Sequence, residues 1–138
     1  MPFRFEGLEI WHKARDFSAH IYEVTAKFPP HELYGLANQM NRASNAVALL
    51  IAEGADLDTN ALFNHRLGLA VGETSEVAAA SFLALDRKYI TAEQQANIHE
   101  WADELARKIN AFRHTLRYAM CYTRYATRHL RFARSLHA

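Results

Sequence analysis

The sequence predicts an all-α protein folded as an antiparallel, up-down four-helix bundle. Four segments carry apolar residues at alternating steps of three and four, short connections separate them, and no segment shows the alternation of a strand. Helices with one apolar face are buried most economically against one another. With 138 residues, 50% of them hydrophobic, the chain is expected to form a single domain over residues 1–138.

The first helix is expected at about residues 8–27, because the prolines at 29–30 disfavour helical geometry before them. The second helix should start near His31 or Glu32, with the Glu32 carboxylate at the positive end of the helix dipole. Gly54 is the residue type that most easily adopts a left-handed helix end, so the helix should stop there. Its apolar stripe is Leu33, Leu36, Met40, Ala43, Val47 and Leu50.

The third helix is predicted at about residues 60–87, and Thr59 or Asp58 could cap its first turn. Gly68 and Gly72 lie one turn apart on it, which favours close approach of another helix. A capping-box pattern, Thr91 followed by Gln94, opens the fourth helix. No glycine or proline follows, so this helix is expected to continue past the bundle, or to bend, as a basic, aromatic extension from about residue 118.

The single cysteine, Cys121, cannot form an internal disulfide, which is typical of a reducing compartment and predicts a cytoplasmic protein. The N-terminus has no apolar core of a signal peptide. No apolar run approaches the roughly 18–20 residues of a membrane span, so no membrane association is expected.

Several patterns in the chain could carry chemistry. A dinuclear metal bundle needs two Glu-x-x-His pairs, but only Glu9 and His12 show this spacing, and Glu73 with Glu76 lacks a histidine. The first helix also aligns acidic and histidine side chains, which predict a solvated face or a surface site for a divalent ion: Glu9, His12, Asp16, His20 and Glu23. With no nucleophile motif and no phosphate loop, the chain is expected to be non-enzymatic, without cofactor or metal.

Charge is distributed unevenly along the chain. Residues 1–112 hold ten basic and fifteen acidic residues, whereas residues 113–138 hold six basic residues and no acidic one. Arginines interleaved with aromatic residues can contact phosphates and stack on unpaired bases, or pack on a neighbouring subunit. The candidate nucleic-acid-binding residues are Arg113, Arg117, Tyr118, Tyr122, Arg124, Tyr125, Arg128, Arg131 and Arg134.

The ordered motifs of the first three helices together carry a family resemblance. They are Leu8, Glu9, Ile10 and Trp11 with Lys13 and Ala14; Ile21, Tyr22, Phe28 and Pro29; Glu32, Leu33, Tyr34, Gly35, Leu36 and Gln39; Arg42 and Ala43; Ile51, Ala52, Glu53 and Gly54; and Leu67, Ala70, Gly72 and Glu76. Over about residues 5–116 the chain resembles the four-helix-bundle protein family also called the 23S rRNA intervening sequence proteins. The resemblance implies an up-down bundle, a homo-oligomeric ring, most often a pentamer, and a basic surface that engages RNA or a ribonucleoprotein.

Three polar residues match the family pattern, namely Arg42, Glu53 and Glu76. They are interpreted as an ion-pair or capping network, with a catalytic pair as the alternative. Residues 46–50 depart from the family, because a proline-containing run is replaced by alanine, valine and leucine. The second helix is therefore expected to run straight through them. The function expected is a non-enzymatic, oligomeric bundle engaging RNA; the alternatives are a structural scaffold and a metal-binding enzyme.

Overall fold

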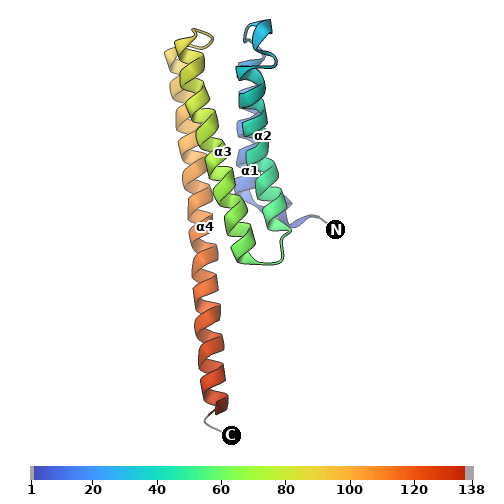
Figure 1. Ribbon diagram of the computed structural model, residues 1–138, viewed down its shortest axis with the longest axis vertical. Helices are drawn as coiled ribbons and strands as arrows, with labels where there is room; N and C mark the ends of the chain where they lie inside the picture. Colours follow the sequence, from blue (N-terminus) through green and yellow to red (C-terminus); the bar gives the residue numbers. More distant parts are fainter. Residues whose placement is uncertain (1, 136–138) are drawn as a thin grey trace.

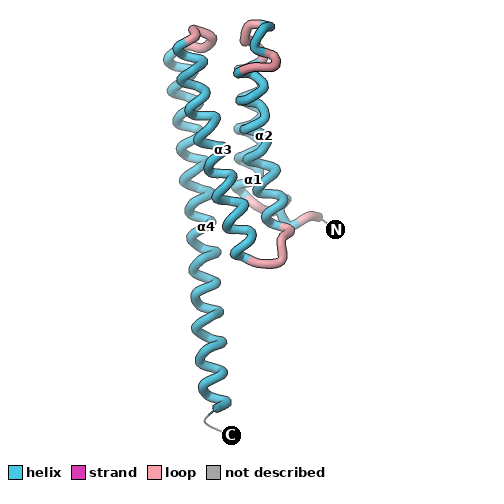
Figure 2. Tube along the Cα trace, viewed as in Figure 1, coloured by secondary structure: helices cyan, strands magenta, loops and turns pink. Residues whose placement is uncertain are grey.

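A computed structural model describes the backbone of residues 2–135 and the side chains of residues 2–119 and 121. It confirms an all-helical fold, with no strand in this part of the chain (Figures 1 and 2). The 3-10 helices are η1 (Arg4–Gly7) and η2 (Pro30–Glu32), and the α-helices are α1 (Glu9–Thr25), α2 (Leu36–Ala55), α3 (Asn60–Asp86) and α4 (Ala92–Ser135).

The four α-helices pack as an up-down bundle. α2 lies between α1 and α3, α3 packs on α4, and α1 touches α4 less extensively. Burial of the apolar faces stabilises this arrangement, at about 1.5–3 kcal/mol for each large side chain fully removed from water. The largest fully buried side chains come from all four helices: Phe17, Ile21, Met40, Val47, Ile51, Phe63, Leu67, Val77, Ile98, Leu105 and Ile109.

The start of α2 differs from the sequence prediction. The helix begins at Leu36 rather than at His31 or Glu32, because residues 30–32 form the separate turn η2. Gly35, with φ −110° and ψ −121°, breaks the continuity between the two. Leu33 is 63% exposed, so the buried stripe of α2 starts one turn later than predicted. Through residues 46–50 the helix is unbroken.

Gly54 does not end α2 in a left-handed turn. It lies inside the helix, which closes at Ala55, and no described glycine has a positive φ. Its role is close packing, since a Cβ there would lie 2.7 Å from Cδ2 of Phe63 and 3.0 Å from Cβ of Arg66 on α3. The left-handed residue is Lys88 (φ 61°), just after α3.

The two glycines of α3 have different surroundings. A Cβ at Gly68 would lie 3.0 Å from Nη2 of Arg113, so this glycine does allow close approach of α4. Gly72 has nothing within 4 Å of such a Cβ, so the same prediction is wrong there.

The ends of α3 and α4 follow the predicted capping. Oγ1 of Thr59 accepts from the amide of Leu62 at 3.2 Å at the start of α3. At the start of α4, Thr91 and Gln94 bond reciprocally, at 2.8 and 3.1 Å.

α4 continues well past the bundle rather than bending. Leu116 is the last α4 residue buried among those whose side chains are described, and the helix runs on to Ser135. These 19 further residues span roughly 28 Å at about 1.5 Å per residue. Figure 1 shows this stretch projecting beyond the connection between α2 and α3.

Gly54→Ala is expected to lower the free energy of unfolding by about 1–3 kcal/mol, because the added methyl group forces α2 away from Phe63. Urea denaturation measures the change. Gly72→Ala is the matched control and should raise stability by about 0.5–1 kcal/mol, since it adds helix propensity in open space. Equal effects at both positions would show that close packing at Gly54 is unimportant.

Candidate functional site

The basic surface of α4 begins at Arg113, which is anchored in the bundle. Its Nε donates to Oδ1 of Asn64 on α3 at 3.0 Å, and its Nη1 donates to Oδ1 of Asn110 at 3.2 Å. Gly68 provides the space for its guanidinium. The bond to Asn64 links α4 to α3. Because both acceptors are neutral amides, these bonds do not pair the positive charge of Arg113 with a carboxylate.

Arg117 and Tyr118 lie just beyond the last buried residue of α4. Both are exposed, Tyr118 by 72%, so their side chains are accessible for contacts with another molecule. The remaining candidates lie on the helical backbone but outside the residues whose side chains are described: Tyr122, Arg124, Tyr125, Arg128, Arg131 and Arg134.

Arg42 forms an ion-pair cluster that joins α2 to α3. Its Nη2 donates to Oε1 of Glu76 at 2.8 Å, and its Nη1 lies 3.6 Å from Oε1 of Glu73. The hydrogen bond to Glu76 and the charge of Glu73 raise the pKa of Arg42. Oε2 of Glu73 is buried without a hydrogen-bond partner among the described residues. Glu73 is therefore a third member of the cluster, which the sequence did not indicate.

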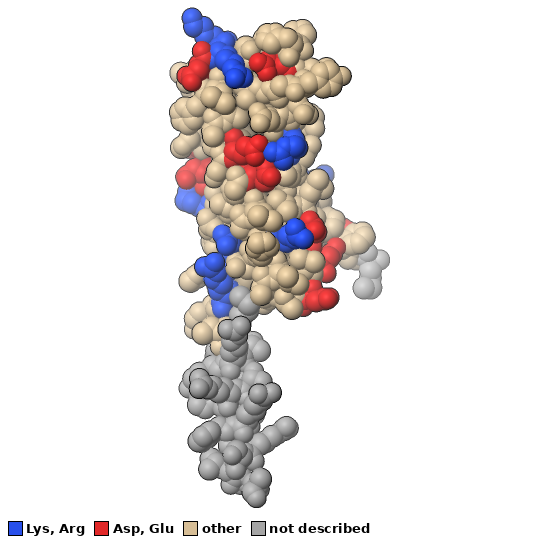
Figure 3. Space-filling view, in the orientation of Figure 1, with Lys and Arg blue, Asp and Glu red and all other residues tan. Residues whose placement is uncertain are grey.

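Glu53 does not join this cluster. Its Oε1 lies 3.3 Å from Nη2 of Arg66 on α3, in a second α2–α3 ion pair. Figure 3 shows mixed-charge patches on the α2–α3 side, separated by uncharged surface. The predicted ion-pair network is therefore present as two separate links, one between Arg42 and Glu76 and one between Glu53 and Arg66.

A further polar cluster, which sequence patterns did not predict, lies at the end of the bundle opposite the α2–α3 connection. Oε2 of Glu32 accepts from the amide of Leu36 at 2.7 Å, and its Oε1 accepts from the hydroxyl of Tyr89 at 2.9 Å. Arg87 lies 3.6 Å from the same carboxylate. These contacts cap α2 and connect the α1–α2 and α3–α4 segments. Only the placement of Glu32 near the positive end of the helix pointed to this role.

The contacts of this polar cluster shift the pKa values of Glu32 and Tyr89. The bond from Leu36, then the bond from Tyr89, lower the pKa of Glu32. Burial raises the pKa of Tyr89, and its bond to Glu32 raises it further. Glu32 therefore stays ionised, and Tyr89 stays protonated as the donor.

The aligned side chains of α1 do not converge on one point. Glu9 accepts from Nζ of Lys108 at 3.4 Å, Nε2 of His12 bonds to the carbonyl of Glu6 at 2.7 Å, and the ring of His20 lies 4.6 Å from that of Trp101. Among the described residues no group of three or more His, Cys, Asp or Glu side chains could hold a metal ion.

One groove between α3 and α4 is lined by Ser75, His99 and Asp103. Ser75 and Asp103 form hydrogen bonds within their own helices: Ser75 donates to the carbonyl of Val71 at 3.2 Å, and Asp103 accepts from Arg107 at 3.0 Å. The geometry does not connect a nucleophile to a base there.

The fold and these links define a four-helix bundle held together by inter-helix ion pairs, from which one helix projects. The chain belongs to the 23S rRNA-intervening sequence protein family, whose sequence model matches residues 6–111. The match ends where α4 is about to leave the bundle.

Among solved structures, the chain is similar to a protein of unknown function from the S23 ribosomal protein family of Bacteroides thetaiotaomicron. The identity is 20%, the TM-score is 0.67, and the similarity covers 75% of this chain and 97% of the other. This likeness supports the fold alone. Among curated proteins none matches the sequence. In the described part of the chain, no helix has the length and apolarity to cross a membrane.

Glu32→Gln is expected to destabilise the protein at pH 7, because a neutral amide caps α2 and accepts from Tyr89 less strongly than a carboxylate. The folded pKa of Glu32 is lowered from 4.5, so its contribution is complete above pH 4.5 and is lost as the pH falls through the folded value.

Urea midpoints of wild type and variant should therefore differ most at pH 7 and converge below pH 4.5. Glu23→Gln is the control, since Glu23 is exposed and makes no ion pair with a described residue. A difference in urea midpoint that does not change with pH would contradict the stabilising role assigned to the Glu32 carboxylate.

Proposed function

We propose that this protein is a non-enzymatic, cytoplasmic homo-oligomer that engages RNA or a ribonucleoprotein through the basic surface of α4. The observation that carries the proposal is the projection of α4, from the last buried residue Leu116 to Ser135. From residue 117 to the end, the sequence has five arginines and no acidic residue.

A partner would stabilise a projecting helix of this kind. In proteins, most helical stability comes from packing an apolar face against other groups. Arginine supplies guanidinium groups for phosphate oxygens, and exposed rings such as Tyr118 supply stacking platforms for unpaired bases. A partly single-stranded RNA provides phosphates for the guanidinium groups and unpaired bases for the aromatic rings.

The family-signature residues support a role in the framework rather than in catalysis. Arg42 is paired with Glu76, and Glu53 with Arg66, and each pair spans α2 and α3. Both pairs are substantially exposed, so each contributes only about 0–1 kcal/mol. Their function in this proposal is to fix how α2 lies on α3.

RNA binding is expected to weaken in a variant carrying Arg117→Gln and Arg124→Gln. The slope of log affinity against log salt should fall by about 0.7 for each phosphate of single-stranded RNA that the variant no longer neutralises. Mobility shifts with structured and single-stranded RNA at two salt concentrations measure both effects. The control carries Lys27→Gln and Arg107→Gln, which remove the same charge from exposed sites on the bundle. Equal weakening in both variants, or no salt-dependent binding of the wild type at micromolar protein, would refute RNA binding by α4.

The second candidate function is a scaffold built from several copies. Large exposed apolar side chains favour it, among them Leu62 and Leu69, which lie two turns apart on α3. Neighbouring exposed apolar residues mark protein interfaces. The family resemblance favours a ring, with a pentamer as the form expected.

Light scattering is expected to give five times the 15.8 kDa chain mass for the wild type, and a mass near that of one chain for a variant carrying Leu62→Gln and Leu69→Gln. Phe82→Gln is the control, since Phe82 is equally exposed on α3 but lies beside His99 of α4. Deleting residues 118–138 should abolish RNA binding and leave the number of copies in the assembly unchanged. Dissociation on that deletion would instead assign α4 to assembly.

A further inference from the structure

We propose that the groove between α1 and α2 binds an extended peptide segment of another protein, through hydrogen bonds to the main chain of that segment. The groove consists of two hollows, with volumes of about 520 and 380 Å³, and Asn45 lines both of them. Each volume lies in the range of about 300–1,000 Å³ that is usual for ligand sites. The groove belongs to the bundle, so this site is separate from the RNA contact proposed for α4.

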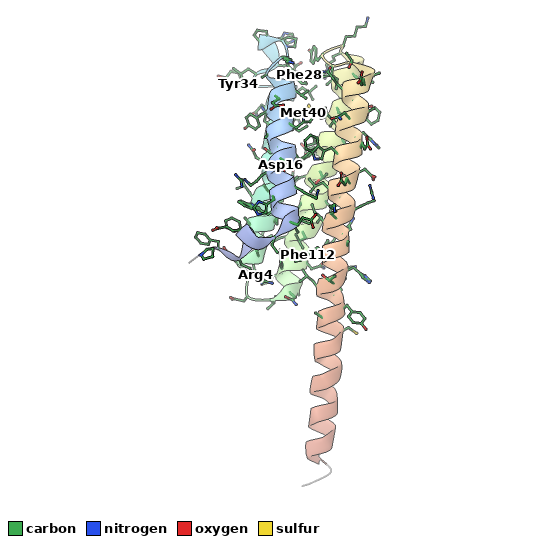
Figure 4. The ribbon with its side chains drawn as sticks, turned by 180° about the vertical axis from the view of Figure 1, so that it is seen from behind. Arg4, Asp16, Phe28, Tyr34, Met40 and Phe112 are labelled. Atoms are coloured by element: carbon green, nitrogen blue, oxygen red, sulfur yellow. The ribbon has the colours of Figure 1, made fainter. Side chains whose placement is uncertain are left out.

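The length of the groove suits a short extended segment. On α2 its lining runs from Ala37 to Leu49, which is about 18 Å at about 1.5 Å per residue. An extended chain rises about 3.3 Å per residue, so about five residues span this length. Leu33 lines one hollow and Leu49 the other, and they are 63% and 67% exposed, so each offers an apolar contact. Figure 4 shows Phe28 and Tyr34 at the end of the bundle where α1 and α2 are connected, which is the end near Leu33.

A row of side-chain amides follows α2 along the groove. Asn38, Asn41 and Asn45 are spaced by three and four residues, so they lie on one side of the helix, and all three line the groove. Asn41 and Asn45 are about 6 Å apart along the helix axis. Alternate residues of an extended chain are about 6.6 Å apart. A carboxamide has both a donor and an acceptor, so the row can pair with peptide N–H and C=O groups that recur at nearly the same interval.

Hydrogen bonds to α1 fix the middle of the row. Oδ1 of Asn45 accepts from Oγ of Ser18 at 2.7 Å, and its Nδ2 donates to the hydroxyl oxygen of Tyr22 at 2.9 Å. Because the Tyr22 oxygen accepts this bond, its own proton is available to a ligand. Tyr22 is 45% exposed, so a peptide carbonyl can reach it.

The rest of the row keeps free donors. Oδ1 of Asn41 accepts from Oγ1 of Thr25 at 2.8 Å, which holds the amide in place. Within the described part of the chain, neither Nδ2 of Asn41 nor the side-chain amide of Asn38 has a hydrogen-bond partner. These groups can therefore bind a ligand without breaking a bond of the bundle.

The charges of the lining disfavour RNA as the occupant. Its charged residues are Arg15 and Arg42. Arg42 is paired with Glu76 and Glu73, so that cluster holds one positive and two negative side chains. The guanidinium of Arg15 lies 4.8 Å from the centre of the Trp11 ring. Phosphate binding depends on several unpaired cations, and these contacts do not supply them.

The free amides also distinguish an extended segment from a helix. A helix satisfies its backbone N–H and C=O groups internally, so its main chain has nothing to offer to Asn38 and Asn41. Covering these amides without pairing them would oppose binding. An extended main chain has free donors and acceptors on alternate residues. We therefore expect an uncharged segment whose alternate side chains are apolar and contact Leu33 and Leu49.

Phage display of random heptapeptides on the full chain tests the proposal. It should enrich sequences with apolar residues at alternate positions. A synthetic peptide of the enriched sequence should bind, and methylation of its alternate backbone nitrogens in one register should abolish binding. Methylation in the other register should be tolerated. The proposal is overturned if no sequence is enriched, or if methylation in both registers leaves binding intact.

Two substitutions locate the site. Asn38→Asp and Asn41→Asp should each weaken the peptide about tenfold in fluorescence anisotropy, because a carboxylate lacks the N–H donors and repels a peptide carbonyl. Asn38 lies in the first turn of α2, where a carboxylate suits the helix dipole, so that variant should stay folded. Asn97→Asp is the matched control, since Asn97 is exposed on α4. Equal weakening by the control would place the peptide outside the groove.

Two further outcomes would assign the groove to a different occupant and overturn the proposal. Loss of RNA binding in Asn38→Asp would make the groove an RNA site. A change in the light-scattering mass of this variant would make it a contact between copies. If no peptide binds the wild type while salt-dependent RNA binding persists, the groove proposal fails and the function proposed for α4 stands.

Discussion

α4 has 44 residues, whereas α1, α2 and α3 have 17, 20 and 27, so the three shorter helices cannot cover its full length. This difference in length leaves the C-terminal part of α4 outside the bundle. α4 fills its place in the core as far as Leu116 and then continues to Ser135. The sequence changes at the same point, since acidic residues end at Glu104 while arginines continue to Arg134. Length and charge thus change together where α4 leaves the bundle, and the proposed RNA contact rests on this coincidence.

Several polar side chains of the bundle link one helix to another. Arg42 and Glu53 connect α2 to α3, Arg113 connects α3 to α4, and Glu32 connects the two segments at the far end. A side chain held in this way is a poor candidate for catalysis, which supports the proposed framework role. The proposed homo-oligomer carries one α4 extension for each copy. Several weak contacts with one RNA would then reinforce one another through high effective concentration.

The fold was predictable because helical periodicity reports burial directly, and the capping residues Thr59 and Thr91 lie where local hydrogen bonding requires them. Gly54 was misinterpreted because a glycine near a helix end fits both a left-handed turn and close packing, and only the position of Phe63 distinguishes them. The hydrogen bond between Tyr89 and Glu32 was not predictable, since it joins residues 57 positions apart. The pairing of Arg42 with Glu76 followed from motif matching, whereas Glu73 required the geometry of α2 against α3.

The central claim is that α4 beyond the bundle is the surface that meets RNA. The most direct measurement is ultraviolet cross-linking in the native cell, followed by purification of the protein and mass spectrometric mapping of the RNA-linked peptides. Linked peptides are expected from residue 113 onward, and none from α2 or α3. Cross-links confined to α1, α2 or α3, or protein recovered without any linked RNA, would contradict it.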